Sequence, residues 1–265
     1  MVSFNPLTAS PPEEVPLKDA PLIRVIAQVR FPPILSIEKR DFVGSFQEAI
    51  REKYPILQPE QTQTFVFGPQ GALQPTLQLT WRFIDTVDSW RVSLAPDFMT
   101  LETTAYSSRH DFLERLEDVL TALKKSFDPQ IIERFGLRYI DRLTGQDLLD
   151  ISSLVKPEIS GMLAAEFRED IYQAINEFLF IIPGGEERIL ARWGLMPAGS
   201  TFDLNSIEPI TESSWILDLD MSLAKNREFS IEGLMHEGQR FAERIYTFFR
   251  WAVKDDFLQR FGGEL

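Results

Sequence analysis

The chain has 265 residues, of which 44% are hydrophobic, so it is long and apolar enough to bury a sizeable core. Its formal net charge of −13 argues against a general attraction to nucleic acid, because neutralising phosphates with Lys and Arg supplies most of that binding energy. The lack of cysteine excludes disulfides, thiol nucleophiles and thiolate metal sites.

The distribution of apolar residues and of charge limits location and partners. No apolar run approaches the ~20 residues needed to cross a bilayer, and the start MVSFNPLTASPPEEVPL lacks the basic and then apolar order of a signal peptide. We therefore expect a cytoplasmic protein that does not bind membranes. Residues 1–143 carry 16 Lys and Arg against 19 Asp and Glu, whereas residues 144–265 carry 11 against 21. The negative charge of the C-terminal half favours solubility and basic partners, and the alternative is a solvated acidic surface with no partner.

The first predicted elements are an arm, a strand and a helix. Residues 1–20 include ASPPEEVPLKDAP, which is rich in proline and charge and is interpreted as an extended N-terminal arm. The segment LIRVIAQVRF at 22–31 alternates its side chains with the period of two that is typical of a strand. In DFVGSFQEAI at 41–50 the apolar residues recur on one helical face, and Pro55 ends this helix.

Four short strands, a helix and a longer strand are predicted next. The helix begins near Ser108, whose hydroxyl can cap the first turn, and HDFLERLEDVLTALKKSF presents an apolar stripe. The segment IIERFGLRYIDRL at 131–143 then returns as a strand. The four strand candidates, each bounded by Gly, Pro or Asp turn signals, are QTFVF at 63–67, TLQLTWRFI at 76–84, SWRVSLA at 89–95 and FMTLETT at 98–104.

The second half repeats these patterns more loosely. The segment IYQAINEFLFIIPGGEERILARWGLM predicts two strands around a Gly184–Gly185 turn, although residues 166–177 fit a helix equally well. SWILDLDMSLA at 214–224 alternates strictly, as a strand does. A long helix is predicted over 230–253, and DDFLQRFGG after it forms a short helix that two glycines can end.

This order of elements predicts the fold class α+β. The order β, α, four β, α, β contains the split βαβ, ferredoxin-like pattern with an extra hairpin, in which the first and last strands lie side by side and antiparallel. We interpret residues 21–145 as a first α+β half and residues 146–265 as a second, smaller α+β half packed against it. Two sheets then pack together, and one continuous domain is the alternative.

The two histidines are not predicted to form a catalytic or metal site. His110 and His236 each lie on a predicted helix, and neither has a second histidine or a carboxylate in a recognised metal-ligand pattern. Glu114, four residues after His110, is interpreted as a surface neighbour. No G-x-S-x-G elbow accompanies either histidine. We therefore predict no catalytic residues and no cofactor.

One acidic pair has the spacing of a metal site. Asp218 and Asp220 share a face of the predicted strand at a separation of ~7 Å, which is near enough to share a hard cation. The alternative is that DLD forms the solvated face of a half-buried strand. GPQG at 68–71 and PGG at 183–185 are turns without the GKS or GKT of a phosphate-binding loop. We therefore expect no metal, and only Asp218 and Asp220 remain as candidates.

Arginine recurs at every fourth position of RFGLRYIDRL, residues 134–143. In a strand, Arg134, Arg138 and Arg142 share one face. If the predicted first strand lies alongside, Arg24 and Arg30 point to the same face. These five residues are called the arginine face, and we predict that they bind an anion or a partner.

The opposite face of this strand is predicted to face the core. Asp141 fits this apolar face worst, and we expect it at the strand end or paired with an arginine. The face comprises Phe135, Leu137, Tyr139, Asp141 and Leu143.

The arginine face has two interpretations. Arginine forks bind carboxylates and phosphates bidentately, so an anionic ligand or an acidic protein segment fits them. Alternatively, the arginines pair with the acidic second half of the same chain and hold two sheets or two subunits together. The two interpretations predict opposite exposures of these side chains.

Three segments together resemble a known family. PLKDAPLIRVIAQVRF, SWRVSLAPDFMTLETTAYSSRHDFLERLEDVL and RFGLRYIDRL are similar to a sporadically distributed bacterial family of uncharacterised proteins of about this length. The resemblance covers nearly the full chain and is weakest from 145 to 210. It implies one conserved unit in a bacterial cytoplasm, and it carries over no activity, cofactor or catalytic residue. The patchy distribution implies an accessory role, such as defence or toxin neutralisation.

These observations favour a non-enzymatic cytoplasmic protein that binds another macromolecule, as an accessory or neutralising partner. The expected partner is another protein or a second copy of the chain. The alternative is a protein that binds a small nucleotide-like anion, or a metal-dependent enzyme, through the arginine face. Nucleic-acid binding through the same face is a third hypothesis that the net charge disfavours.

Overall fold

The computed structural model describes residues 4–64, 67–68, 71–72 and 76–264. Its strands are β1 (Leu22–Arg30), β2 (Ile56–Thr64), β3 (Phe67–Gly68), β4 (Gly71–Ala72), β5 (Thr76–Ile84), β6 (Trp90–Ala95), β7 (Phe98–Thr103), β8 (Ile131–Thr144), β9 (Ala174–Ile181), β10 (Arg188–Met196) and β11 (Ser214–Glu228). Its α-helices are α1 (Arg40–Ile50), α2 (Arg109–Phe127), α3 (Gly145–Leu149), α4 (Ile151–Leu154), α5 (Pro157–Ser160), α6 (Ile231–Ala252) and α7 (Asp255–Arg260). Short 3₁₀ turns lie at Leu35–Glu38, Gly161–Ala164 and Arg168–Asp170.

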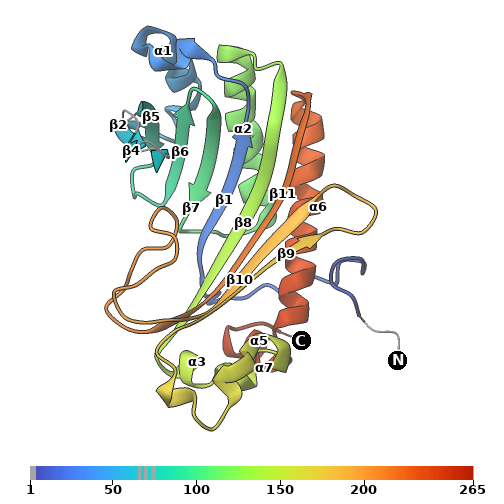
Figure 1. The fold of residues 1–265 in the computed structure, drawn as a ribbon. Coiled ribbons are helices and arrows are strands. Elements are labelled where there is room, and N and C mark those ends of the chain that lie inside the picture. The colour runs from blue at the N-terminus through green and yellow to red at the C-terminus, as the bar shows by residue number, and fades with distance from the viewer. Residues whose placement is uncertain (1–3, 65–66, 69–70, 73–75, 265) are drawn as a thin grey trace. The chain divides into compact units, whose positions relative to one another are not determined.

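The fold is mixed α+β, as predicted. Nine strands form one antiparallel sheet in the order β2-β5-β6-β7-β1-β8-β11-β10-β9, and β3 pairs with β4 separately (Figure 1). In the part of the chain that the structure describes, no helix combines the length and the apolar character needed to cross a bilayer.

The chain divides into two compact units, each built from segments that are distant in sequence. Unit 1 comprises Met1–Val25, Leu137–Leu223 and Gln239–Leu265, and unit 2 comprises Ile26–Gly136 and Ala224–Gly238. Strands β1, β8 and β11 therefore contribute residues to both units. Each unit contains residues from both sides of residue 145.

In unit 2, aromatic side chains hold two helices on the sheet. Phe46 of α1 contacts Phe83 of β5 with ring centroids 5.4 Å apart and Phe127 of α2 with centroids 6.2 Å apart. Trp90 of β6 lies 5.8 Å from Phe112 of α2. The apolar stripes predicted for both helices thus form the core of this unit.

In unit 1, the end of the sheet and the N-terminal arm both contact α6. Phe180 of β9 lies against Phe248 of α6, with ring centroids 5.6 Å apart. The backbone nitrogen of Val15 donates a hydrogen bond of 2.7 Å to the hydroxyl of Tyr246. The arm predicted at residues 1–20 is therefore attached to a helix from the other end of the chain.

Two predicted elements differ from the observed ones. Strand β2 spans Ile56–Thr64, whereas the predicted strand at 63–67 lies partly outside the described residues. Strand β2 was not predicted because its sequence, with Pro59 and several Gln and Thr residues, does not alternate apolar and polar side chains. A strand at the edge of a sheet can form without such alternation. The helical alternative for 166–177 is wrong, because β9 begins at Ala174.

The expectation of two separate sheets is also wrong. Strands from both halves of the chain join one sheet, in which β8 lies between β1 and β11. The physical reason is that β8 has a second edge whose backbone groups need partners, and β11 supplies them. The first strand lies beside β8, as expected, and the ferredoxin-like assignment itself stays a prediction.

Candidate functional site

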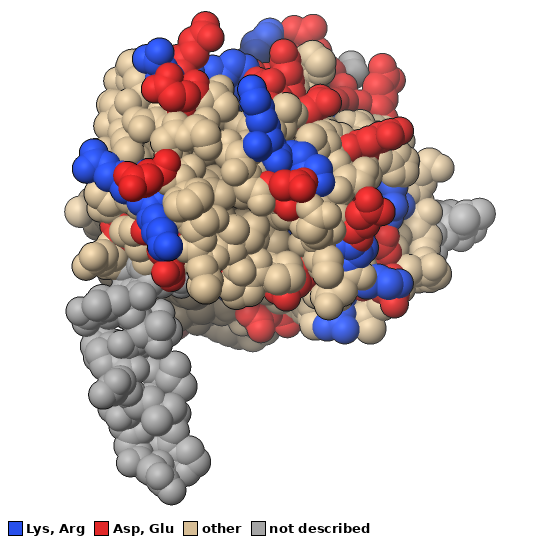
Figure 2. Space-filling view, turned by 90° about the horizontal axis from the view of Figure 1, so that it is seen from above, with Lys and Arg blue, Asp and Glu red and all other residues tan. Residues whose placement is uncertain are grey.

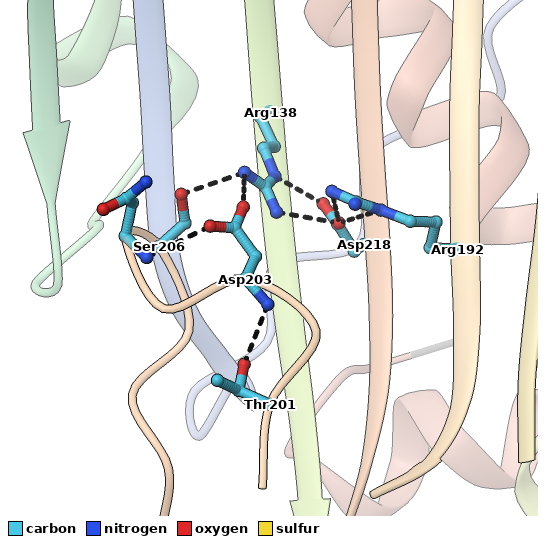
Figure 3. Close-up of polar contacts among 7 residues, drawn as sticks. Arg138, Arg192, Thr201, Asp203, Ser206 and Asp218 are labelled. Carbon is cyan, nitrogen blue, oxygen red and sulfur yellow. Dashed lines mark hydrogen bonds and ion pairs between the residues drawn. The ribbon is translucent and has the colours of Figure 1, made fainter. Parts of the chain in front are cut away.

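Arg138, from the middle of the predicted arginine face, binds two carboxylates in unit 1 (Figure 3). Its Nε donates to Oδ1 of Asp218 at 2.7 Å and its Nη2 donates to Oδ2 at 2.9 Å, which is a bidentate fork. Its Nη1 donates to Oδ2 of Asp203 at 2.7 Å and to Oγ of Ser206 at 2.9 Å. These contacts occupy most of the donor hydrogens of the guanidinium group.

A second arginine shares the same carboxylate. Arg192 of β10 lies directly opposite Asp218 of β11 in the strand register, and its Nε donates to Oδ2 of Asp218 at 2.9 Å. The side chain of Asp218 is only 1% exposed, whereas those of Arg138 and Arg192 are 13% and 17% exposed. We call Arg138, Arg192, Asp203, Ser206 and Asp218 the Arg138 cluster.

The segment between β10 and β11 supplies two members of this cluster. Asp203 and Ser206 belong to it, and the backbone nitrogen of Asp203 donates to Oγ1 of Thr201 at 3.1 Å (Figure 3). Phe202 of the same segment lies 4.7 Å below the guanidinium group of Arg192, measured to the ring centroid. The segment also contributes to a buried apolar cluster with the sheet, formed by Ile140, Met196, Ile207 and Ile216, with Ile23 and Phe202 packed against it.

The Arg138 cluster is balanced in charge, with two arginines and two aspartates. Burial lowers the pKa of Arg138, but hydrogen bonds and charge attraction from Asp218 and Asp203 outweigh it and hold the pKa above its usual value. Burial raises the pKa of Asp203, and Arg138 reverses this effect, so the net pKa is lowered. Each group therefore stabilises the charged form of the other.

Two further members of the arginine face lie in unit 1 near Glu208. Nη2 of Arg24 forms an ion pair with Oε1 of Glu208 at 3.6 Å, and Nη2 of Arg142 donates to the backbone oxygen of Glu208 at 2.6 Å. Burial lowers the pKa of Arg142, the Glu208 carboxylate raises it and Arg24 lowers it, and the net shift is downward. Glu208 belongs to the same segment between β10 and β11 as Asp203.

The remaining two members lie in unit 2. Nη2 of Arg30 donates to Oδ2 of Asp97 at 2.6 Å, and Nη1 of Arg134 donates to Oε1 of Gln28 at 3.2 Å. On the face of the molecule in Figure 2, blue and red side chains lie next to one another rather than forming one basic patch. Arg24, Arg30 and Arg138 of the arginine face pair with carboxylates of their own chain.

Asp218 and Asp220, the candidate metal pair, lie in different surroundings. Both oxygens of Asp218 accept hydrogen bonds from guanidinium groups, so they face positive charge. Asp220 lies opposite Leu190 in the strand register, two residues further along β11. Within the described residues, no group of three His, Asp or Glu side chains is arranged to hold a metal ion. His110 and His236 lie on α2 and α6, where helices were predicted.

Asp141 differs from its expected position. It lies within β8 rather than at a strand end, and it is 7% exposed. The neighbouring Arg138 and Arg142 donate their hydrogen bonds to Asp218, Asp203, Ser206 and the backbone oxygen of Glu208. Burial raises the pKa of Asp141 to about 7, with no hydrogen bond or charge contributing to the shift. Asp141 is buried because the alternation of β8 places residue 141 on the same face as the apolar side chains of Phe135, Leu137 and Leu143.

The sequence-based predictions did not identify the most exposed apolar strand of unit 1. In β9, the exposed fractions are 42% for Ile175, 46% for Phe178, 58% for Leu179 and 63% for Ile181. We call these four residues the apolar edge. The sequence AINEFLFI gave an indication of this, because it has apolar residues on both alternating faces. A strand with one solvated face has polar residues on that face.

The apolar edge belongs to a wider concentration of exposed apolar side chains. Among the described residues, fifteen large hydrophobic side chains are exposed, and nine of them lie between residues 149 and 204. These nine are Leu149, Met162, Phe167, Tyr172, Ile175, Phe178, Leu179, Ile181 and Leu204. Four of the nine lie on the single strand β9, which makes this strand the candidate interaction surface.

Comparison with protein-family models and with curated proteins found no match for this chain.

Proposed function

We propose that this protein acts without catalysis, as an accessory or neutralising protein that binds another protein chain at β9. The observation that carries the proposal is the apolar edge of an end strand. An extended segment that pairs with such a strand gains backbone hydrogen bonds along its length, and its alternate side chains contact both faces of the sheet. The partner's apolar side chains would cover Phe178 on one face and Leu179 on the other.

The two end strands of the sheet support this proposal by their contrast. In β2, Pro59 and Glu60 occur in the middle of the strand, and Glu60 pairs with Arg82 of β5. Proline and charge at an edge prevent other strands from pairing with it. In β9 the only charged residue is Glu177, and the strand contains no proline, lysine or arginine. Only β9 has the composition of an edge that pairs.

The backbone around β9 is arranged to hold this edge in place. Gly194 of β10 has a φ of 151°, and a Cβ atom there would lie 1.8 Å from the backbone oxygen of Ala174. Glycine therefore allows the close approach of β10 to β9. The ring of Phe178 stacks on Trp193 of β10 at a centroid distance of 5.0 Å. A fixed edge binds a partner at a lower entropic cost than a mobile one.

The anion-binding alternative has less support from the same geometry. An anion needs arginine donors that face solvent, whereas Arg138 donates to Asp218, Asp203 and Ser206 of its own chain. The proposed role of the Arg138 cluster is therefore to stabilise unit 1. Binding is assigned to the apolar edge.

Capture from the native host tests the proposal. We expect the tagged wild-type chain to retain a protein, either another protein or an untagged copy of itself, and Leu179→Lys to reduce this recovery at least about tenfold. The reason is that a lysine in an edge strand blocks pairing. Measurement of the retained protein by mass spectrometry gives the ratio.

Val87→Lys is the matched control, because Val87 is also an exposed apolar residue, at 75%, and lies in the turn between β5 and β6. It should retain the same protein as the wild type. Equal recovery by Leu179→Lys, with circular dichroism showing that the variant is folded, contradicts the proposal. So does a wild-type chain that retains no protein.

A further inference from the structure

We infer that the chain bound at β9 is a second copy of this protein, whose own β9 pairs antiparallel with the first across a twofold axis. This inference rests on the proposed function, because it names the partner of the same edge. Twofold pairing uses one surface twice, so the strand must be complementary to itself. The sequence AINEFLFI meets this requirement at one position of the twofold axis.

A twofold axis perpendicular to the sheet places residues of the same face opposite each other. Two positions of the axis keep seven of the eight residues of β9 paired, with the centre at residue 177 or at residue 178. The first position places Glu177 opposite Glu177 of the second copy, and like charges directly opposite destabilise a strand pair. The second places Ile175 opposite Ile181 and Glu177 opposite Leu179. A centre at any other residue pairs five residues of the strand or fewer.

The geometry therefore selects the axis at Phe178. Seven residues, 175 to 181, are then paired within the observed bounds of β9. On one face, the two Ile175–Ile181 pairs lie at the ends of the interface. On the other face, Phe178 meets Phe178 of the second copy, next to the ring of Phe180, whose centroid is 5.9 Å from that of Phe178. Aromatic pairs of this kind are among the favourable cross-strand pairs.

Charge distinguishes a second copy from a basic partner at the same edge. Each chain has a formal net charge of −13, so two copies repel each other at long range. Salt screens this repulsion within about 10 Å at 0.1 M. A dimer held by apolar contacts and backbone hydrogen bonds should therefore tighten as salt is added. Binding of a basic segment should weaken under the same change.

The first arm of the test measures mass. We expect sedimentation of the wild-type chain to show that its mass doubles as the protein concentration rises. The protein concentration at the midpoint of this change should be lower in about 0.5 M NaCl than in about 0.05 M NaCl. A wild-type chain that stays monomeric at every concentration and salt level overturns the inference. So does a dimer whose midpoint rises with salt.

The second arm uses the cysteine-free sequence to identify the register. Directly opposite residues in an antiparallel pair have Cα atoms about 4.5–5.5 Å apart, which permits a disulfide. Phe178→Cys should therefore form a covalent dimer on oxidation, whereas Val87→Cys, at an exposed position outside β9, should not. If Phe178→Cys does not fold, Ile175→Cys combined with Ile181→Cys replaces it, since these positions face each other between copies but are about 20 Å apart within one strand.

Covalent dimer from a β9 cysteine variant, but not from Val87→Cys, supports the inference, and equal cross-linking in both overturns it. A different result would contradict the proposed function. A monomeric chain that still retains a different protein, and loses it in Leu179→Lys, keeps the proposed function and removes only the second copy.

Discussion

Replacing Asp218 with alanine is expected to lower the free energy of unfolding by about 3–5 kcal/mol, which is the cost of removing one partner from a buried ion pair. Asp218 accepts hydrogen bonds from both Arg138 and Arg192. Without it, two guanidinium groups lie close together in a site that is largely closed to water, and their repulsion is poorly screened. Urea denaturation of the variant and the wild type measures the difference.

Arg30→Ala is the control for this prediction. Its ion pair with Asp97 is similar in length to the Arg138–Asp218 contact, but the Arg30 side chain is 46% exposed. Exposed pairs of this kind contribute less than about 1 kcal/mol. A loss below about 1 kcal/mol in Asp218→Ala as well would show that the Arg138 cluster does not stabilise unit 1.

Replacing Asp141 with asparagine is expected to stabilise the protein, and increasingly so as the pH rises. The pKa of Asp141 is about 7 in the folded protein against an ordinary value of 3.8, so the folded state binds the proton more tightly than the unfolded state. The wild type therefore loses stability as the pH rises from 4 to 7, by at most about 4 kcal/mol from this group. Asparagine carries no charge and removes this loss.

Unfolding free energies of the wild type and the variant at several pH values between 4 and 8 test this expectation. The advantage of Asp141→Asn should grow with pH and level off above pH 7. Asp88→Asn, at a carboxylate whose side chain is 71% exposed, should give a profile parallel to that of the wild type. An Asp141→Asn difference that is the same at pH 4 and pH 8 would show that the buried carboxylate does not bind the extra proton.

The sequence predicted local structure where one face of an element is apolar. The alternation in 131–143 and in 214–224 indicated β8 and β11, and the stripe after Ser108 indicated α2, whose first turn the Ser108 hydroxyl caps. The period of such a pattern is contained in a short stretch of sequence, so it predicts the type of element without knowledge of the tertiary structure. Strand β2 carries no such pattern and was not predicted.

Two of the five members of the Arg138 cluster were singled out from the sequence, and their contact was not predicted. Arg138 and Asp218 were both singled out, one as an anion site and the other as a metal candidate. Their contact depends on β8 and β11 being neighbours in the sheet, and strand order is not encoded in the alternation of either strand. Asp203 and Ser206 come from an irregular segment, for which periodicity offers no signal.

The sequence of β9 shows apolar residues on both faces, but the exposure of these residues could not be predicted without the strand order. A strand that is apolar on both faces is typical of the centre of a sheet, where both faces are covered. The structure places β9 at the end of the order instead, so the same residues become exposed. Among the described residues β9 pairs with β10 on one side, and the proposed function supplies a neighbour on the other.

Amide hydrogen exchange of the two end strands tests this account most directly. The full chain is compared at concentrations below and above the midpoint of association, and again with any protein that it retains. We expect peptides containing Ala174–Ile181 to become protected on association, while peptides from Ile56–Thr64, the edge with Pro59 and Glu60, keep the same exchange rate. Unchanged exchange in β9, with protection appearing elsewhere in the chain, would contradict the assignment of β9 as the binding surface.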